Sequence, residues 1–122
     1  MTVVDTTVLV DHLRGRRQAH DYLASLADVP ICSEVTRVEI LTGLRSQERK
    51  AAERLFAVVD WVPVNEEIAR RAGELGRRYR RSHRGLSLAD LVVGATAMQL
   101  GRRVATLNVR HFPMFPRLQP PY

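Results

Sequence analysis

The amino-acid sequence predicts one α/β domain built on a parallel sheet of four to five strands. Short runs of β-branched residues alternate along the chain with longer segments whose apolar residues recur at helical spacing. Strands that alternate with helices form parallel sheets that are covered by helices on both faces. The chain has 122 residues and no repeat, low-complexity tract or Gly/Ser linker, so we expect residues 1–122 to form a single domain.

The N-terminal half of the chain begins with a strand that leads directly into a helix. Residues 2–4 are apolar, Asp5 interrupts them, and the apolar pattern resumes from Thr6 at helical spacing. This order predicts a strand, a turn and a helix start. The same criteria predict a helix over 18–26, a strand over 29–32, a helix that Ser33 caps and that continues to Leu44, and a helix over 48–59.

The C-terminal half adds two strands and two long helices. Residues 60–64 predict a strand, and Pro63, which lacks an amide donor, favours an edge position in the sheet. The remaining predicted elements are a helix over 68–81 capped by residues 65–67, a helix from Ser87 to Leu100 closed by Gly101, and a strand over 103–107.

Composition restricts the classes of protein that the chain can belong to. It carries 19 Lys and Arg against 13 Asp and Glu, a formal net charge of +6, and a single cysteine, Cys32. One cysteine excludes an intrachain disulfide scaffold and paired-cysteine zinc or redox sites, and it fits a reducing, cytoplasmic compartment. Apolar stretches fall far short of the roughly 20 residues of a membrane span, so we expect no membrane anchor and no signal peptide.

Nearly all of the positive charge comes from arginine, since Lys50 is the only lysine. Guanidinium groups match phosphate oxygens, which favours a nucleic-acid or acidic protein partner. Codon bias in a GC-rich genome explains the same composition equally well. The densest cluster, here called the arginine cluster, consists of Arg77, Arg78, Arg80, Arg81 and Arg84.

Two aspartates do not fit their apolar surroundings. Asp5 follows the first strand at the carboxyl edge of the predicted sheet, where parallel sheets place ligand groups, although an N-cap for the next helix explains it equally well. Asp90 is the only charged residue in a helix that is apolar nearly all round and is therefore predicted to be buried. Its structural alternative is a capping box with Ser87.

Two further residues offer side-chain oxygens near the same edge. Glu39 lies beside the apolar stripe of the helix after Ser33, and alone it is better explained as a surface partner of Arg37 or Arg45. Asn108 follows the last strand, where alone it reads as an ordinary turn residue.

These four residues make chemical sense as one site. A parallel sheet gathers Asp5, Glu39, Asp90 and Asn108 into one crevice, where neighbouring carboxylates repel unless a cation lies between them. Mg²⁺ or Mn²⁺ takes such oxygen ligands, and it activates water against a phosphodiester. We therefore expect phosphodiester hydrolysis. The histidines, residues 12, 20, 83 and 111, show no close pair at helical spacing and predict no rival metal site.

Four segments carry a resemblance over essentially the whole chain. They are residues 4–10 (VDTTVLV), 38–44 (VEILTGL), 88–97 (LADLVVGATA) and 104–112 (VATLNVRHF). In this order and at this spacing they resemble the PIN domains of the VapC toxin family. The resemblance implies a PIN-like three-layer α/β/α fold and a Mg²⁺- or Mn²⁺-dependent endoribonuclease that cleaves structured RNA such as tRNA or rRNA.

The resemblance also assigns expected roles. It places Asp5, Glu39 and Asp90 at the acidic catalytic and metal-binding positions. Asn108 falls at a fourth catalytic position that is often Asp, and His111 stands where many relatives carry an acidic residue. These departures favour one ion held mainly by Asp5 and Asp90, with Glu39 acting directly or through water. The hydroxyls of Thr6 and Thr106 are expected to orient water or the carboxylates.

The implied partners are a cognate VapB-type antitoxin, an RNA and a second copy in a homodimer, with toxin–antitoxin hetero-oligomers as a further form. Arg110 and the arginine cluster would contact RNA phosphates, and His83 and His111 lie next to arginines. The main alternative is a degenerate PIN fold that binds RNA or regulates without cleaving it. A phosphoacceptor receiver is disfavoured because Lys50 lies mid-helix, and a haloacid-dehalogenase-type phosphatase because Thr7 replaces the second aspartate that it requires.

Overall fold

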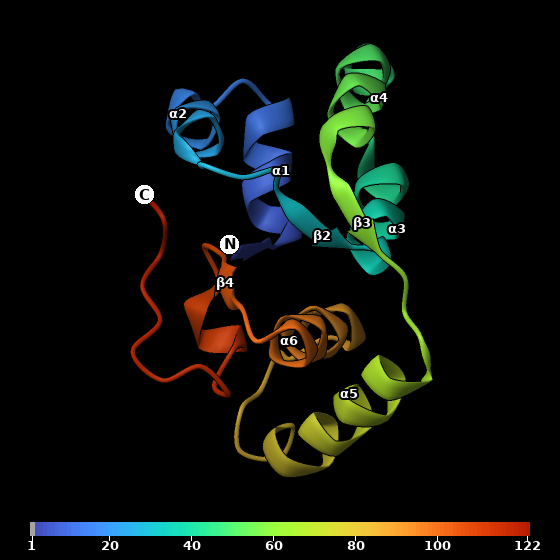
Figure 1. The fold of residues 1–122 in the computed structure, drawn as a ribbon, viewed down its shortest axis with the longest axis vertical. Helices are drawn as coiled ribbons and strands as arrows, with labels where there is room; N and C mark the ends of the chain where they lie inside the picture. The colour runs from blue at the N-terminus through green and yellow to red at the C-terminus, as the bar shows by residue number, and fades with distance from the viewer. Residues whose placement is uncertain (1) are drawn as a thin grey trace.

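Four short strands form one parallel sheet in the order β3-β2-β1-β4 in the computed structural model, which describes residues 2–122 (Figure 1). The elements are β1 (Thr2–Val4), α1 (Thr6–Leu13), α2 (Arg17–Ser25), β2 (Ile31–Ser33), α3 (Glu34–Gly43), α4 (Arg49–Val58), β3 (Asp60–Val62), α5 (Glu66–Tyr79), α6 (Leu88–Leu100) and β4 (Arg103–Ala105), with 3-10 turns η1 (Ser46–Glu48) and η2 (Val109–His111). The predicted parallel α/β sheet is confirmed.

Strand β1 spans its predicted range, whereas β2 is shifted and β3 and β4 are shorter than predicted. For β4 the reason is visible just after its last residue. The backbone N–H of Leu107 donates to Thr7 Oγ1 at 3.1 Å, and that of Asn108 donates to Thr106 Oγ1 at 2.9 Å. These amides are bound by side chains and not by a neighbouring strand, so the ladder ends at Ala105. The predicted edge position is confirmed, because β3 pairs only with β2 and Pro63 follows it.

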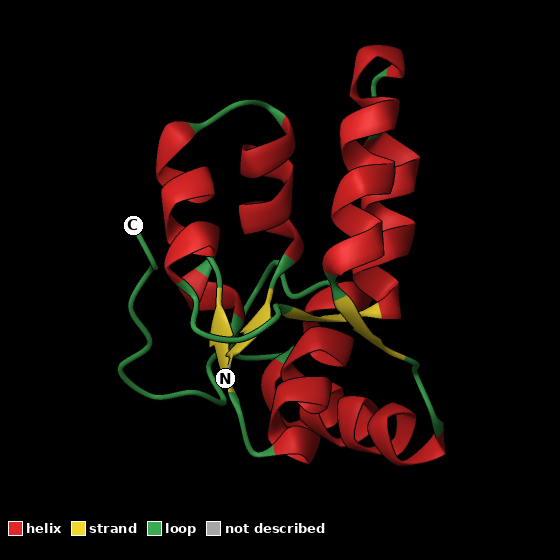
Figure 2. Ribbon diagram, turned by 45° about the horizontal axis from the view of Figure 1, so that its top comes forward, coloured by secondary structure: helices red, strands yellow, loops and turns green. Residues whose placement is uncertain are grey.

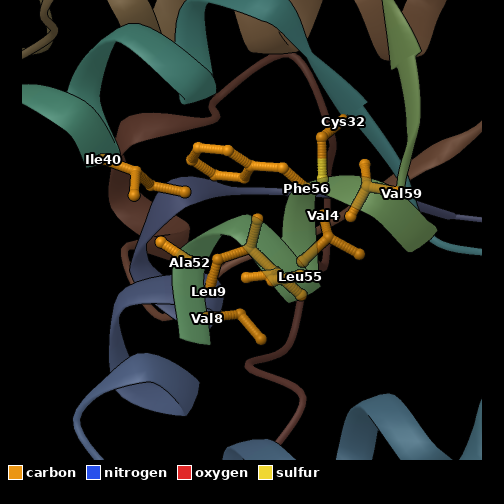
Figure 3. Packing of buried hydrophobic residues seen from close by; sticks show 9 residues of the cluster. All are labelled: Val4, Val8, Leu9, Cys32, Ile40, Ala52, Leu55, Phe56 and Val59. Atoms are coloured by element: carbon orange, nitrogen blue, oxygen red, sulfur yellow. The ribbon is translucent and has the colours of Figure 1, made fainter. Parts of the chain in front are cut away.

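Successive residues of a strand face opposite sides of the sheet, and the core divides accordingly. Val4 and Cys32 pack on the side of α1 and α4, whereas Val3 and Ile31 pack on the side of α6. Figure 3 shows the first of these clusters, in which side chains of β1, α1 and α4 meet Cys32. Figure 2 shows the sheet between the two groups of helices, which confirms the three-layer architecture.

Helix α6 lies against the centre of the sheet. Every residue from Leu91 to Ala97 is buried, as the apolar sequence predicts, and Gly101 closes the helix with φ +64°. No helix among residues 2–122 combines the length and the apolar character needed to cross a membrane.

Cys32 is expected to be nearly inert toward thiol reagents while the protein is folded. It is fully buried on β2, and burial, assisted by the charge of Asp5, raises the pKa of its thiol from 9.0 to about 12. At pH 8 this lowers the thiolate fraction about a thousandfold. Iodoacetamide labelling followed by mass spectrometry should give slow modification in buffer and complete modification in denaturant. Equal rates in the two conditions would contradict this burial.

Candidate active site

A cleft opens at the carboxyl edge of the sheet, where β1 and β4 end side by side. It has a volume of about 320 Å³. It is lined by Asp5, Thr6, Thr7, Val10, Asp11, Glu39, Asp90, Leu107 and Asn108. The structure therefore brings together all four oxygen-bearing residues that the sequence singled out, although they come from four segments far apart in the chain.

Asp5 forms the floor of this cleft. Its position is fixed by the sheet register, since Val4 pairs with Ala105 and the Asp5 amide donates to the Ala105 carbonyl at 2.9 Å. The residue is 3% exposed. Although Asp5 occupies the N-cap position of α1, its side chain makes no capping hydrogen bond. The N-cap alternative therefore does not account for its carboxylate.

The Asp5 carboxylate is held by two threonine hydroxyls. Thr106 Oγ1 donates to Oδ2 of Asp5 at 2.7 Å, and Thr7 Oγ1 donates to the same oxygen at 3.1 Å. Burial nevertheless raises the pKa of Asp5 above its ordinary value of 3.8, and the negative charge of Asp90 adds to the effect. None of the ion pairs found among residues 2–122 involves Asp5. A bound cation would offset both the burial of the ionised Asp5 carboxylate and its repulsion by Asp90, and it would thereby stabilise the charged form.

Asp90 forms the capping box with Ser87 that was the structural alternative for this residue, and it also lines the cleft. Ser87 Oγ accepts from the Asp90 amide at 3.0 Å, and the Ser87 amide donates to Asp90 Oδ2 at 2.9 Å, which completes a capping box. His111 Nδ1 lies 3.1 Å from the same oxygen. Capping α6 and facing the cleft are therefore compatible, because one carboxylate has two oxygens.

Glu39 does not form the surface ion pair that its sequence neighbours suggest. Arg37 pairs with Glu34, with Nε 2.6 Å from Oε1. Glu39 Oε1 instead accepts a hydrogen bond of 2.5 Å from Thr6 Oγ1, whose oxygen lies 3.1 Å from Thr36 Oγ1. Glu39 is exposed at the mouth of the cleft, and Thr6 fixes its direction. The Thr6 hydroxyl thus contacts the glutamate, whereas the backbone amide of Thr6 is the group that interacts with the Asp5 carboxylate.

The sequence did not single out Asp11 as a residue of this cleft, and it did not predict the contacts that Thr7 makes there. Thr7 joins the two strand ends, because its hydroxyl accepts from the Leu107 amide while it donates to Asp5. Asp11 lies one helical turn beyond Thr7 on α1, and its Oδ2 accepts from the Tyr122 hydroxyl at 2.8 Å. The spacing Thr7 to Asp11 places both residues on one helix face, and this signal was available in the sequence.

Carboxylate and amide oxygens are the donors that a hard divalent ion takes. Within residues 2–122, no three His, Cys, Asp or Glu side chains lie close enough together to hold an ion as they stand. The carboxylates of Asp5 and Asp90, which both line the cleft, are a small set of oxygen donors, and such a set suits an ion that keeps several waters, as Mg²⁺ does.

Two of the four histidines lie close together, although their positions in the sequence do not predict a pair. His12 and His20 stack with ring centroids 5.6 Å apart, because the hairpin of α1 and α2 brings them together. Burial, and next the neighbouring His20, lowers the pKa of His12 below 6.5. Parallel rings direct their nitrogen lone pairs side by side and not toward one point, so this pair does not form a chelating site.

The arginine cluster occupies the end of α5 and the loop to α6, and each of its five side chains is exposed, as is Arg110 in η2. None of these six forms an ion pair with any residue from 2 to 122. Gly85 of this loop lies near the ring of His111, whose Nδ1 is 3.1 Å from Oδ2 of Asp90, a residue of the cleft. The cationic surface thus borders the acidic cleft.

Comparison with known proteins places this fold and cleft in a family. Residues 2–117 match the family model described as PIN domain. Ribonuclease VapC19 of Mycobacterium tuberculosis is 49% identical over 125 residues, which cover 100% of both chains. Ribonuclease VapC10 of the same organism is 47% identical over 124 residues, which cover 100% of this chain and 93% of the relative. A solved toxin–antitoxin complex from Klebsiella pneumoniae has a TM-score of 0.83 at 27% identity and covers 100% of this chain and 98% of its own. The chain therefore belongs to the PIN domain family, among the VapC-type ribonuclease toxins.

Proposed function

We propose that the chain is the toxin of a VapBC-type pair and that its cleft hydrolyses RNA phosphodiester bonds with one Mg²⁺ or Mn²⁺. The observation that carries the proposal is the convergence of Asp5, Glu39, Asp90 and Asn108 on one cleft, with the buried Asp5 carboxylate outside every ion pair found in residues 2–122. PIN-domain nucleases of the VapC type are generally metal-dependent, and this donor set fits that chemistry.

We assign each residue of the cleft a separate role in cleavage. Asp5 and Asp90 would hold the ion, which when bound would supply charge neutralisation at the phosphate and a water of lowered pKa. Thr106 and Thr7 keep the Asp5 carboxylate in one orientation through their hydroxyls. Glu39, whose Oε1 is held by Thr6, orients the attacking water and accepts its proton at Oε2. The Asn108 amide offers a neutral oxygen in place of a fourth charge, so one firmly held ion is the proposed stoichiometry.

A cleavage assay on RNA with and without chelator tests this proposal. EDTA is expected to abolish cleavage, and added Mg²⁺ or Mn²⁺ to restore it. Glu39→Gln should lower kcat by about 100-fold, because the amide keeps the hydrogen bond from Thr6 but cannot accept a proton. Glu34→Gln, whose carboxylate pairs with Arg37 on the same helix, is the matched control. RNA binding without cleavage in the presence of metal would favour the degenerate RNA-binding alternative.

The proposed substrates are structured RNAs of the tRNA or rRNA class, and the proposed place of action is the cytoplasm. Phosphate contacts from the arginine cluster would position an RNA but would not select its base sequence. Mapping of new RNA ends after induction in cells identifies the target. Ends that appear equally with an inactive Asp5 variant would exclude this chain as their source.

Neutralising three arginines of the cluster is expected to weaken RNA binding, while the rate of the cleavage step changes little. The triple variant Arg80→Gln, Arg81→Gln and Arg84→Gln should raise KM about 10-fold, leave kcat within about twofold, and reduce the salt dependence of binding. An equal number of exposed arginines elsewhere, changed in Arg17→Gln, Arg49→Gln and Arg54→Gln, provides the control. An equal loss in both variants would mean that only net charge matters.

The proposed protein partners are a cognate VapB-type antitoxin and a second copy of the chain. Exposed apolar side chains support an interface on α3, where Val38 is 61% and Leu41 is 49% exposed on either side of Glu39. An antitoxin bound there would cover the mouth of the cleft. Val38→Asp should therefore weaken inhibition by the antitoxin and spare RNA cleavage, as an inhibition titration would measure.

A further inference from the structure

We propose that His111 is a positioning residue for Asp90, which it holds so that one carboxylate oxygen is committed to the protein and the other is left for the ion. This inference rests on the proposed function, since it concerns how one ligand of the proposed ion is oriented. It starts from the 3.1 Å approach of His111 Nδ1 to Asp90 Oδ2.

The contact is attractive when Nδ1 of His111 carries a proton. A bare Nδ1 lone pair facing a carboxylate oxygen at this distance would be repelled, whereas an Nδ1–H is attracted. The Ser87 amide donates to the same oxygen at 2.9 Å. Both contacts therefore fall on Oδ2, and Oδ1 of Asp90 remains for the cleft that this residue lines.

The backbone that carries His111 is anchored on α6 itself. Phe112 is fully buried, and a methyl group added at Gly94 would lie 3.2 Å from the Met114 sulfur and 3.7 Å from the Phe112 ring. Gly94 stands one helical turn beyond Asp90 on the same face of α6. The segment 111–114 thus packs along this face, and the absence of a side chain at Gly94 permits its close approach.

The backbone of Gly85 lies near the other nitrogen of the imidazole. Gly85 has φ +89°, and a methyl group added there would lie 3.4 Å from His111 Nε2. The ring, whose side chain is 33% exposed, therefore lies between the loop that precedes α6 and the first turn of α6. Neighbours on two sides limit the orientations of the ring beside Asp90, which is the property expected of a group that positions a ligand.

The shape of the side chain makes the proposal testable by substitution. The amide NH₂ of asparagine occupies roughly the place of Nδ1, whereas that of glutamine occupies roughly the place of Nε2. His111→Asn should therefore preserve the contact with Asp90, and His111→Gln and His111→Ala should remove it. His83 provides a matched control, because it is a histidine of the preceding loop whose Nδ1 lies 2.7 Å from Ser82 Oγ.

The experiment measures Mn²⁺ affinity by calorimetry and kcat and KM on RNA for these variants, with the thermal midpoint of each metal-free protein as a check of folding. His111→Ala and His111→Gln should bind Mn²⁺ about 10- to 100-fold more weakly and lose kcat, with KM for RNA nearly unchanged. His111→Asn should recover to within about threefold of wild type, and His83→Ala should match wild type in Mn²⁺ affinity and in kcat. Wild-type affinity and kcat in His111→Ala, equal recovery by Gln and Asn, or a rise in KM alone would overturn the proposal. Failure of the wild type itself to bind Mn²⁺ or to cleave RNA would instead overturn the proposed function.

Discussion

Asp5→Asn is expected to abolish RNA cleavage while leaving the metal-free fold at least as stable as wild type. The loss should exceed about 100-fold, since even partners that only orient a ligand are worth 10- to 100-fold. The asparagine Oδ1 can still accept from Thr106 and Thr7, so the two strand ends stay joined. Cleavage rates under single-turnover conditions measure the first effect.

The stability effect follows from the sign of the pKa shift. Burial raises the pKa of Asp5 in the folded protein above its ordinary value, so ionisation of this carboxylate at neutral pH costs the metal-free fold free energy. Asparagine removes that charge and should raise the thermal midpoint in EDTA. Added Mn²⁺ should raise the midpoint of wild type but not that of the variant. A variant that cleaves RNA at the wild-type rate would refute the assignment of Asp5.

Asp90→Asn is expected to cause a loss of cleavage as large as that of Asp5→Asn, by a route that can be separated from its capping role. The asparagine oxygen can accept from the Ser87 amide, so the capping box of α6 is retained while the charge that holds the ion is removed. The variant should therefore melt close to wild type and fail to cleave. Thermal unfolding and the same single-turnover assay measure the two quantities.

Ser87→Ala is the complementary control for Asp90. It removes the hydroxyl that accepts from the Asp90 amide, and it should cost about 1 kcal/mol of stability, as loss of an N-cap usually does. In this variant the backbone amide of residue 87 can still donate to the Asp90 carboxylate, and His111 still lies beside it, so cleavage should persist. Activity lost in Ser87→Ala but kept in Asp90→Asn would show that Asp90 acts only as a cap.

The sequence predicted the fold because its local signals agree with one another. The apolar run before Asp5, the Ser33 cap and the apolar α6 segment each determine an element locally. Sheet register then follows from alternate burial, as Val3 and Val4 show by packing on opposite faces. Strand β4 was predicted too long because the amides that follow it are bound by threonine hydroxyls, a tertiary contact that no local pattern encodes.

The candidate site was predictable to the same degree. Asp5 and Asp90 stand out as charges in apolar surroundings, and this local contradiction marks them. Glu39 does not stand out, because its environment is decided by Thr6, a residue 33 positions away in the chain. The approach of His111 to Asp90 is likewise set by the packing of Phe112 and Met114 on α6. Contacts of this kind require the assembled fold.

The central claim is that Asp5 and Asp90 hold a divalent ion in this cleft, and titration of the purified metal-free protein with Mn²⁺ tests it most directly. Calorimetry, with the electron paramagnetic resonance signal of free Mn²⁺ as a second readout, should give one saturable ion per chain for wild type. Asp5→Asn and Asp90→Asn should show no saturable binding over the same range, while Glu34→Gln should match wild type. Equally tight binding by Asp5→Asn and wild type would contradict the claim.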